Sequence, residues 1–176
     1  MKSKRHLALF GALAVAACVP KREAPPPAPQ QPRETPRPVP PPPPPAAEWR
    51  DAPLTPGGWV YRADGNGSAA LFGVVNSEAQ FSVRCDRSRR QVVLAREGVS
   101  NGRTMTIRTT FSARNFVATA QREPLPYLTA SVAASDPILD GIAFSRGRFT
   151  VEAPGLPMLI IPAWPEPARV VEDCRA

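Results

Sequence analysis

The chain has 176 residues, 24 of them prolines, and a formal net charge of +7. Most of this charge precedes residue 48, because residues 48–176 carry 15 arginines against 13 acidic residues. Such a small excess excludes the strongly basic surface that is typical of nucleic-acid-binding proteins, and we expect no nucleic acid partner.

Residues 1–17 have the features of a secretory signal peptide. Basic residues (Lys2, Lys4 and Arg5) precede an apolar run that is shorter than the roughly 20 residues of a membrane-spanning helix. The run ends in Val-Ala-Ala-Cys18, which resembles the lipobox of bacterial lipoproteins. The resemblance implies cleavage before Cys18, a diacylglycerol on its sulfur and an acylated new N-terminus. The alternative is an ordinary cleaved signal with a chance cysteine.

The residue after Cys18 bears on the destination of such a lipoprotein. Lipoproteins held at the inner membrane commonly carry Asp at this position, whereas this chain has Val19. The resemblance therefore implies an outer-membrane lipoprotein that faces the periplasm. Two or three acyl chains, at about 0.8 kcal/mol per buried methylene, would anchor it stably to the membrane.

Proline dominates the next segment, residues 18–47. Residues 19–47 contain 14 prolines and end in an unbroken run from 40 to 45. Such a sequence cannot build a core, and it favours extended polyproline II structure. At about 3.1 Å per residue it would act as a disordered tether on the order of 80 Å long. The alternative is a ligand for an aromatic groove in another protein.

Residues 48–176 are enough for one domain with its own core. Short runs of alternating apolar and polar residues are separated by turn sequences such as Asp-Gly-Asn-Gly at 64–67. We expect strands at 59–61, 69–75, 81–85, 92–95, 104–109, 116–120 and 128–132, the sixth with Phe116, Ala118 and Ala120 facing inward. The spacing predicts a mainly β fold, an antiparallel β-sandwich or barrel-like domain with one or two short helices.

The last third of the chain mixes helix and strand signals. Asp136 followed by Pro137 predicts a helix start, and Pro165 predicts a second, terminal helix that carries Cys174. Strands are expected at 148–152 and 158–161. Cys85 and Cys174 are an even pair in an oxidising compartment, so we predict a disulfide between the terminal helix and the third strand. The alternative is two buried thiols.

Three stretches, 81–85, 143–149 and 159–174, resemble small proteobacterial periplasmic domains. These are related to invasion-associated locus B and to the type VI secretion accessory protein VasI. They pair a β-sandwich with a late glycine-bearing strand pair and a terminal helix that ends in cysteine. The family's frequent second cysteine pair is absent here. Several such families have no assigned activity, so the resemblance implies a fold rather than a function.

The side chains available limit the possible chemistry. The only histidine, His6, lies in the signal, so the mature chain has no histidine for a nucleophilic triad or a metal site. We expect no metal, no cofactor and no catalytic residue. Asp136 and Asp140 would share one helix face. A glycosidase needs two carboxyl groups that flank the sugar across a cleft, so a helix cap and a surface residue explain this pair more simply.

Arginine offers a possible recognition site. Arg84, Arg108 and Arg148 each alternate with apolar residues and should point away from the core. If their strands are neighbours, the three form a basic stripe that binds an anionic partner. The alternative is an ordinary solvated sheet face.

From these patterns we expect a non-enzymatic envelope lipoprotein that presents a β domain to a protein or to peptidoglycan. The alternative is a carboxylate-dependent hydrolase that acts on envelope glycans.

Overall fold

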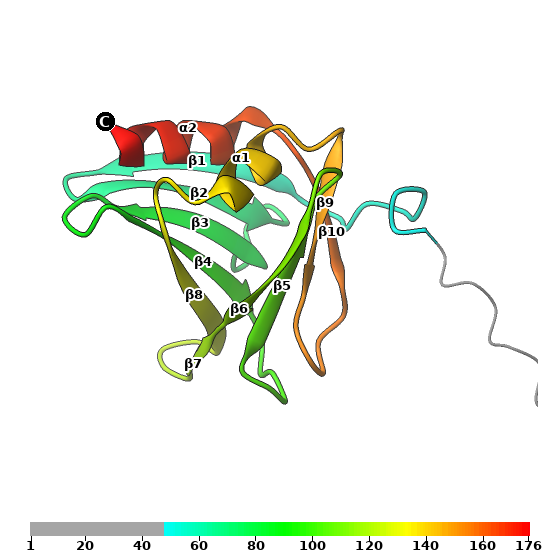
Figure 1. Cartoon of the computed structure of the whole chain (residues 1–176). Helices are drawn as coiled ribbons and strands as arrows, with labels where there is room; N and C mark the ends of the chain where they lie inside the picture. Colours follow the sequence, from blue (N-terminus) through cyan, green and yellow to red (C-terminus); the bar gives the residue numbers. More distant parts are fainter. Residues whose placement is uncertain (1–47) are drawn as a thin grey trace, which may run out of the picture. The chain divides into compact units, whose positions relative to one another are not determined.

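The computed structural model describes residues 48–176 (Figure 1). The predicted signal peptide, Cys18 and the tether lie outside the described residues. Strands dominate the described part and form two antiparallel sheets, with two short helices, so the predicted mainly β fold is confirmed. Neither of these helices has the length and apolar character needed to cross a membrane.

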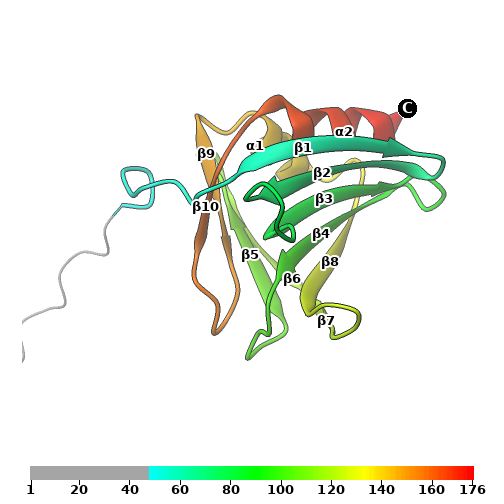
Figure 2. The same cartoon turned by 180° about the vertical axis from the view of Figure 1, so that it is seen from behind.

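The larger sheet has six strands, and Figure 2 shows its first four side by side. In spatial order they are β1 (Gly58–Asp64), β2 (Gly67–Gly73), β3 (Phe81–Asp86), β4 (Gln91–Glu97), β8 (Tyr127–Ala133) and β7 (Thr119–Gln121). The smaller sheet has four, in the order β10 (Leu159–Pro162), β9 (Arg148–Glu152), β5 (Thr104–Arg108) and β6 (Ala113–Val117).

One long chain segment joins the two sheets along one side. β6 pairs with β5 in the smaller sheet, and β7 directly after it pairs with β8 in the larger sheet. The change occurs at Ala118, whose backbone N–H donates to Arg103 O at 2.8 Å. The predicted strand 116–120 is therefore divided. Ala120 is exposed rather than inward, because it lies on the edge strand β7.

Aromatic residues from both sheets meet in the core. Trp59, Phe72 and Phe81 of the larger sheet pack with Phe149 of the smaller one, with ring centroids 5.4 to 6.5 Å apart. The indole of Trp59 donates to Pro162 O at 2.8 Å, which satisfies its polar atom inside the core. The alternation predicted for the third strand is confirmed, since Phe81, Val83 and Cys85 are buried.

The second strand ends earlier than its apolar sequence predicts. The expected run was 69–75, but β2 ends at Gly73. Val74 and Val75 lie in the following loop, with exposed fractions of 49% and 84%. The chain turns away from the sheet here, and Asn76 has the left-handed φ of 63° that short polar side chains tolerate.

Both helices begin where predicted. Asp136 caps α1 (Pro137–Ala143) by accepting a hydrogen bond from the Ile138 N–H at 3.0 Å. Pro165 opens α2 (Pro165–Arg175), which packs against β1, β2 and β3 (Figure 1). The predicted disulfide between Cys85 and Cys174 is present and joins α2 to β3, with the two Cα atoms 5.4 Å apart.

Candidate binding groove

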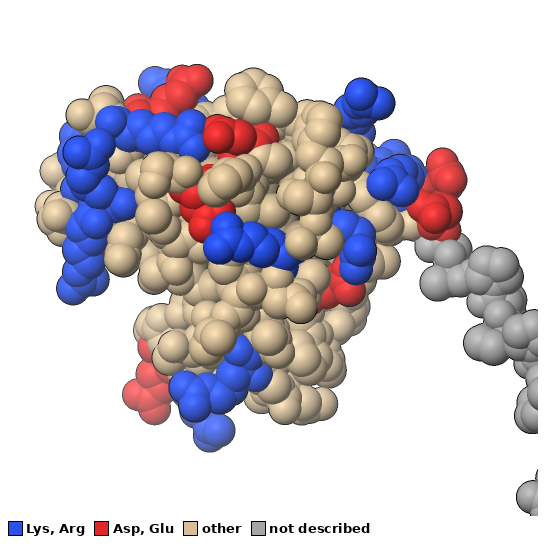
Figure 3. All heavy atoms as spheres, viewed as in Figure 1, with Lys and Arg blue, Asp and Glu red and all other residues tan. Residues whose placement is uncertain are grey.

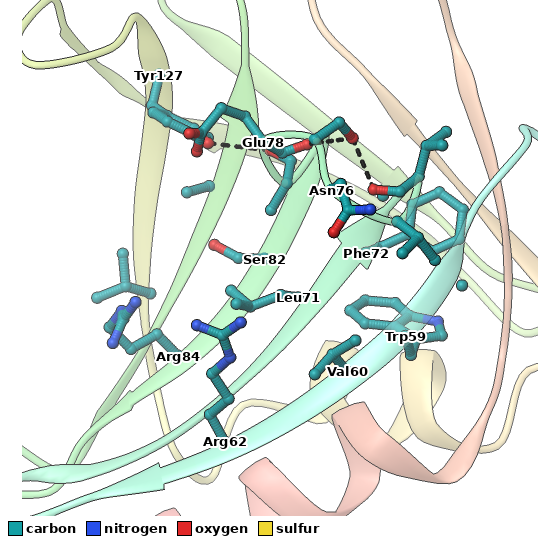
Figure 4. A pocket seen from close by; sticks show the side chains of 18 of the residues that line it. Trp59, Val60, Arg62, Leu71, Phe72, Asn76, Glu78, Ser82, Arg84 and Tyr127 are labelled. Carbon is teal, nitrogen blue, oxygen red and sulfur yellow. Dashed lines mark hydrogen bonds between the residues drawn. The ribbon is translucent and has the colours of Figure 1, made fainter.

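The face of the larger sheet opposite the core holds a groove of about 920 Å³ (Figure 4). That volume lies in the range of pockets that bind small molecules or short segments. Strands β1, β2, β3, β4 and β8 contribute to it, and the loop 74–79 closes one end. The strand register determines which side chains meet on this face.

Small and uncharged side chains form the middle of the groove. Val60 of β1 is opposite Leu71 of β2, and Leu71 is opposite Ser82 of β3. Ser82 in turn is opposite Ala95 of β4, which is opposite Thr129 of β8. None of these side chains is long, so together they form the floor of the groove between the arginine end and the loop 74–79. Val60 is 51% exposed, so apolar surface faces solvent in the groove.

Two arginines lie at one end of this floor. Arg62 of β1 and Arg84 of β3 are both opposite Ala69 of the intervening strand β2. Neighbouring strands are about 4.8 Å apart, so their Cα atoms are about 10 Å apart across a short alanine side chain. Both side chains are exposed, and Figure 4 shows them together on one side of Leu71. This end of the groove is positively charged.

The loop 74–79 forms the opposite end. Ser77 holds it with two bonds to Val74 O, from its hydroxyl at 2.7 Å and its N–H at 3.1 Å. The loop passes closely over the end of β2. A side-chain carbon on Gly73 would lie 3.0 Å from Glu78 O, which requires a glycine or a shifted loop. Val74 and Val75 add exposed apolar surface to this end, which also carries the polar side chains of Asn76 and Glu78.

A hydrogen bond from a tyrosine connects the loop 74–79 to β8, on the other side of the groove from β1. Tyr127 of β8 donates its hydroxyl to Ala79 O at 3.0 Å (Figure 4). Burial raises the pKa of Tyr127, and the negative charges of Glu78 and Glu97 raise it further. Tyr127 therefore remains a neutral donor at physiological pH, and this flank is polar with acidic neighbours.

The groove brings together few acidic side chains. Glu78 is the only carboxylate among the described residues that line it. A pair of carboxylates, which glycoside hydrolysis needs, is not assembled there. Within residues 48–176, no cluster of three or more His, Cys, Asp or Glu side chains could hold a metal ion.

The predicted arginine stripe does not form. Arg84 lies in the larger sheet, whereas Arg108 of β5 and Arg148 of β9 lie in the smaller one. Arg108 pairs with Glu152 (Nε to Oε1, 3.4 Å), and Arg148 donates to Ala52 O at 2.5 Å. The strand phase was predicted correctly, since none of the three side chains is buried in the core. The alternation of apolar and polar residues predicts on which face of its strand a residue lies, but it does not predict which sheet contains that strand.

The two aspartates considered for catalysis have structural partners. Asp136 caps α1 and forms an ion pair with Arg114. Asp140 forms an ion pair with Arg175 of α2 at 2.7 Å. These contacts agree with their simpler interpretation as a helix cap and a surface residue.

A cluster of arginines is visible at another part of the surface. Figure 3 shows basic side chains at the end of the domain near the β3–β4 turn, which contains Arg87, Arg89 and Arg90. All three are exposed, as expected for a hairpin tip, and Arg89 pairs with Asp86 at 3.3 Å.

The groove was not predicted from the sequence, although the sequence contains a pattern that indicates it. Strands β2 and β4 carry apolar or small residues in both phases, for example Leu71 beside Phe72 and Val93 beside Leu94. An antiparallel strand with one solvated face usually alternates with polar residues. Two apolar faces on β2 and β4, the strands on either side of β3, therefore indicate that the outer face also makes contacts. Arg62 was missed because the predicted first strand ended at residue 61.

Comparisons with family models, with curated protein sequences and with solved structures find no match for the chain.

Proposed function

We propose that the protein is a non-catalytic binding module of the bacterial cell envelope. A lipid on Cys18 anchors it to the outer membrane, and the proline-rich segment 18–47 extends the β domain into the periplasm. The groove on the larger sheet binds an envelope partner, either a protein or peptidoglycan.

The observation that carries this proposal is the groove's composition. It has a positively charged end at Arg62 and Arg84, a loop end where Val74 and Val75 expose apolar surface beside polar residues, and uncharged residues between the two ends. Exposed apolar surface next to oriented charge is typical of interaction sites. No observation on the described residues favours the hydrolase alternative over binding, and we do not advance a second function.

Site-specific crosslinking in intact cells tests this proposal. A photoreactive benzophenone side chain replaces Val75 in the groove or, as a control, Val117 on β6. The two valines are matched, with exposed fractions of 84% and 85%. We expect a covalent adduct with a protein or with peptidoglycan from position 75 and none from position 117. The adduct should be lost when Arg62→Gln and Arg84→Gln are added. Equal adducts from both positions, or none from position 75, would contradict the proposal.

A further inference from the structure

We infer that the groove binds a protein partner through an extended segment of about five or six residues that begins with a carboxylate and continues with apolar side chains. The inference rests on the proposed function and chooses between its two kinds of partner. It commits to a peptide segment rather than to a glycan strand.

The carboxylate is matched to the arginine end. Arg62 and Arg84 lie on either side of the buried Ala69, and Figure 4 shows both side chains at the same end of the groove, so a carboxylate at that end can contact both guanidinium groups. Arginine has the fork geometry for bidentate bonds to a carboxylate, and such bonds are about twice as strong as those between neutral groups. A cationic residue at this position would be repelled.

The rest of the groove favours apolar side chains on the bound peptide. From the arginine end, the lining continues along β2 to Leu71, with Val60 opposite it, and then to Val74 and Val75 in the loop. These side chains form an apolar row along the groove, with the polar side chains of Asn76, Ser77 and Ser82 beside it. A glycan strand presents hydroxyl and amide groups rather than aliphatic side chains, so it would cover less of this apolar row. Aliphatic side chains of a peptide instead gain from burial at this end.

The groove's length sets the size of the segment. The path from Ala69 to Val74 follows five residues of extended chain, or about 17 Å. An extended peptide of about five or six residues covers the same distance. Acidic Glu78 lies near the loop end, so a second carboxylate there would be disfavoured. The expected motif therefore carries its negative charge at one end only.

A peptide selection tests the inference without a known partner. The bait is the full chain with Cys18→Ala, purified from periplasm without detergent, and the probe is a displayed library of random octapeptides. Binders are counter-selected on the same chain carrying Arg62→Gln, Arg84→Gln and Val75→Asp. We expect enrichment of peptides with Asp or Glu followed within five positions by Val, Leu, Ile or Phe.

The affinity of an enriched peptide, measured by fluorescence anisotropy, then locates the contacts. We expect binding at least about tenfold weaker with Arg62→Gln/Arg84→Gln, because charge-assisted bonds are lost. Replacing the peptide's acid by its amide should have a similar effect. Val75→Asp, at an exposed loop position, should also weaken binding. The matched control is Arg103→Gln/Arg146→Gln, two exposed arginines outside the groove, which should leave the affinity unchanged.

The outcomes separate the inference from the proposed function. Enriched peptides without an acid, no enrichment over the counter-selected variant, or an affinity unchanged in the arginine variant would each overturn the inference. If soluble peptidoglycan fragments bind through Arg62 and Arg84 while no peptide is enriched, the partner is the cell wall. The inference then fails and the binding function remains. If position 75 also gives no adduct in cells, the proposed function fails as well.

Discussion

Arg96 of β4 shows how a single residue can connect distant segments of this fold. Its side chain is 6% exposed, and burial lowers its pKa, although an arginine stays charged at physiological pH. The guanidinium donates to three backbone carbonyls, those of Gln80, Glu97 and Pro157. Gln80 precedes β3 and Pro157 lies between β9 and β10, so Arg96 joins the two sheets at this end.

Replacing Arg96 should therefore destabilise the domain. Arg96→Met keeps most of the apolar stem but leaves carbonyls such as Pro157 O without this donor. We expect a loss of about 1–2 kcal/mol in the free energy of unfolding, measured by urea denaturation. The control is Arg103→Met, an exposed arginine whose replacement should change stability by less than about 0.5 kcal/mol. Unchanged or increased stability would show that the cost of desolvating Arg96 exceeds the value of its bonds.

Helix α2 is held to the larger sheet by a covalent and a polar contact. The disulfide lies near its C-terminal end, and the Tyr61 hydroxyl of β1 donates to Asp173 Oδ2 at 2.6 Å. This hydrogen bond is the main reason that the pKa of Asp173 is lowered, with a smaller contribution from Arg169, whose guanidinium carbon lies 4.1 Å from the centroid of the Tyr61 ring. The attachment of α2 should therefore respond to acid.

We expect Tyr61→Phe to lower stability at pH 7 by about 1 kcal/mol, the low value expected for a partly exposed bond to a charged group. A carboxylate with a lowered pKa stabilises the folded state at neutral pH, and this contribution is lost as the pH falls through the folded pKa. The difference in melting temperature between wild type and variant should thus shrink as the pH falls from 7 to about 2. Tyr127→Phe is the control, because its bond to Ala79 O does not involve a titrating acceptor. A constant Tyr61→Phe effect across this range would contradict the role of Asp173.

Among the helices and strands, features that depend on neighbouring residues were predicted better than the order of strands in the sheets. Asp136 with Pro137, and Pro165, marked both helix starts, because capping chemistry acts within a few residues. The two cysteines of the domain were sufficient to predict its disulfide. The sheet to which Arg84 belongs could not be predicted, because strand order depends on contacts between segments far apart in sequence. The groove depends on that same order, since it needs β1, β2, β3 and β4 to be neighbours.

The whole molecule combines this folded domain with an N-terminal region known only by its sequence. In the proposed function, a lipid on Cys18 would hold the chain in the envelope, where the groove would meet its partner. A polyproline tether on the order of 80 Å would let a fixed anchor and a distant partner be engaged together. Anchoring and binding should therefore be separable by mutation.

We expect Cys18→Ala to move the protein from the membrane fraction to the soluble periplasmic fraction, because the acyl chains supply the anchoring free energy. Fractionation with immunoblotting measures this, and mass spectrometry of the N-terminal peptide of the wild type should detect the lipid. Val19→Asp is the matched variant: it keeps the lipid, and the lipoprotein resemblance implies a shift from the outer to the inner membrane. In both variants the octapeptide selected on the groove should bind unchanged, since residues 48–176 are untouched. A Cys18→Ala protein that still sediments with outer membranes and resists salt extraction would show that another part of the chain provides the anchor.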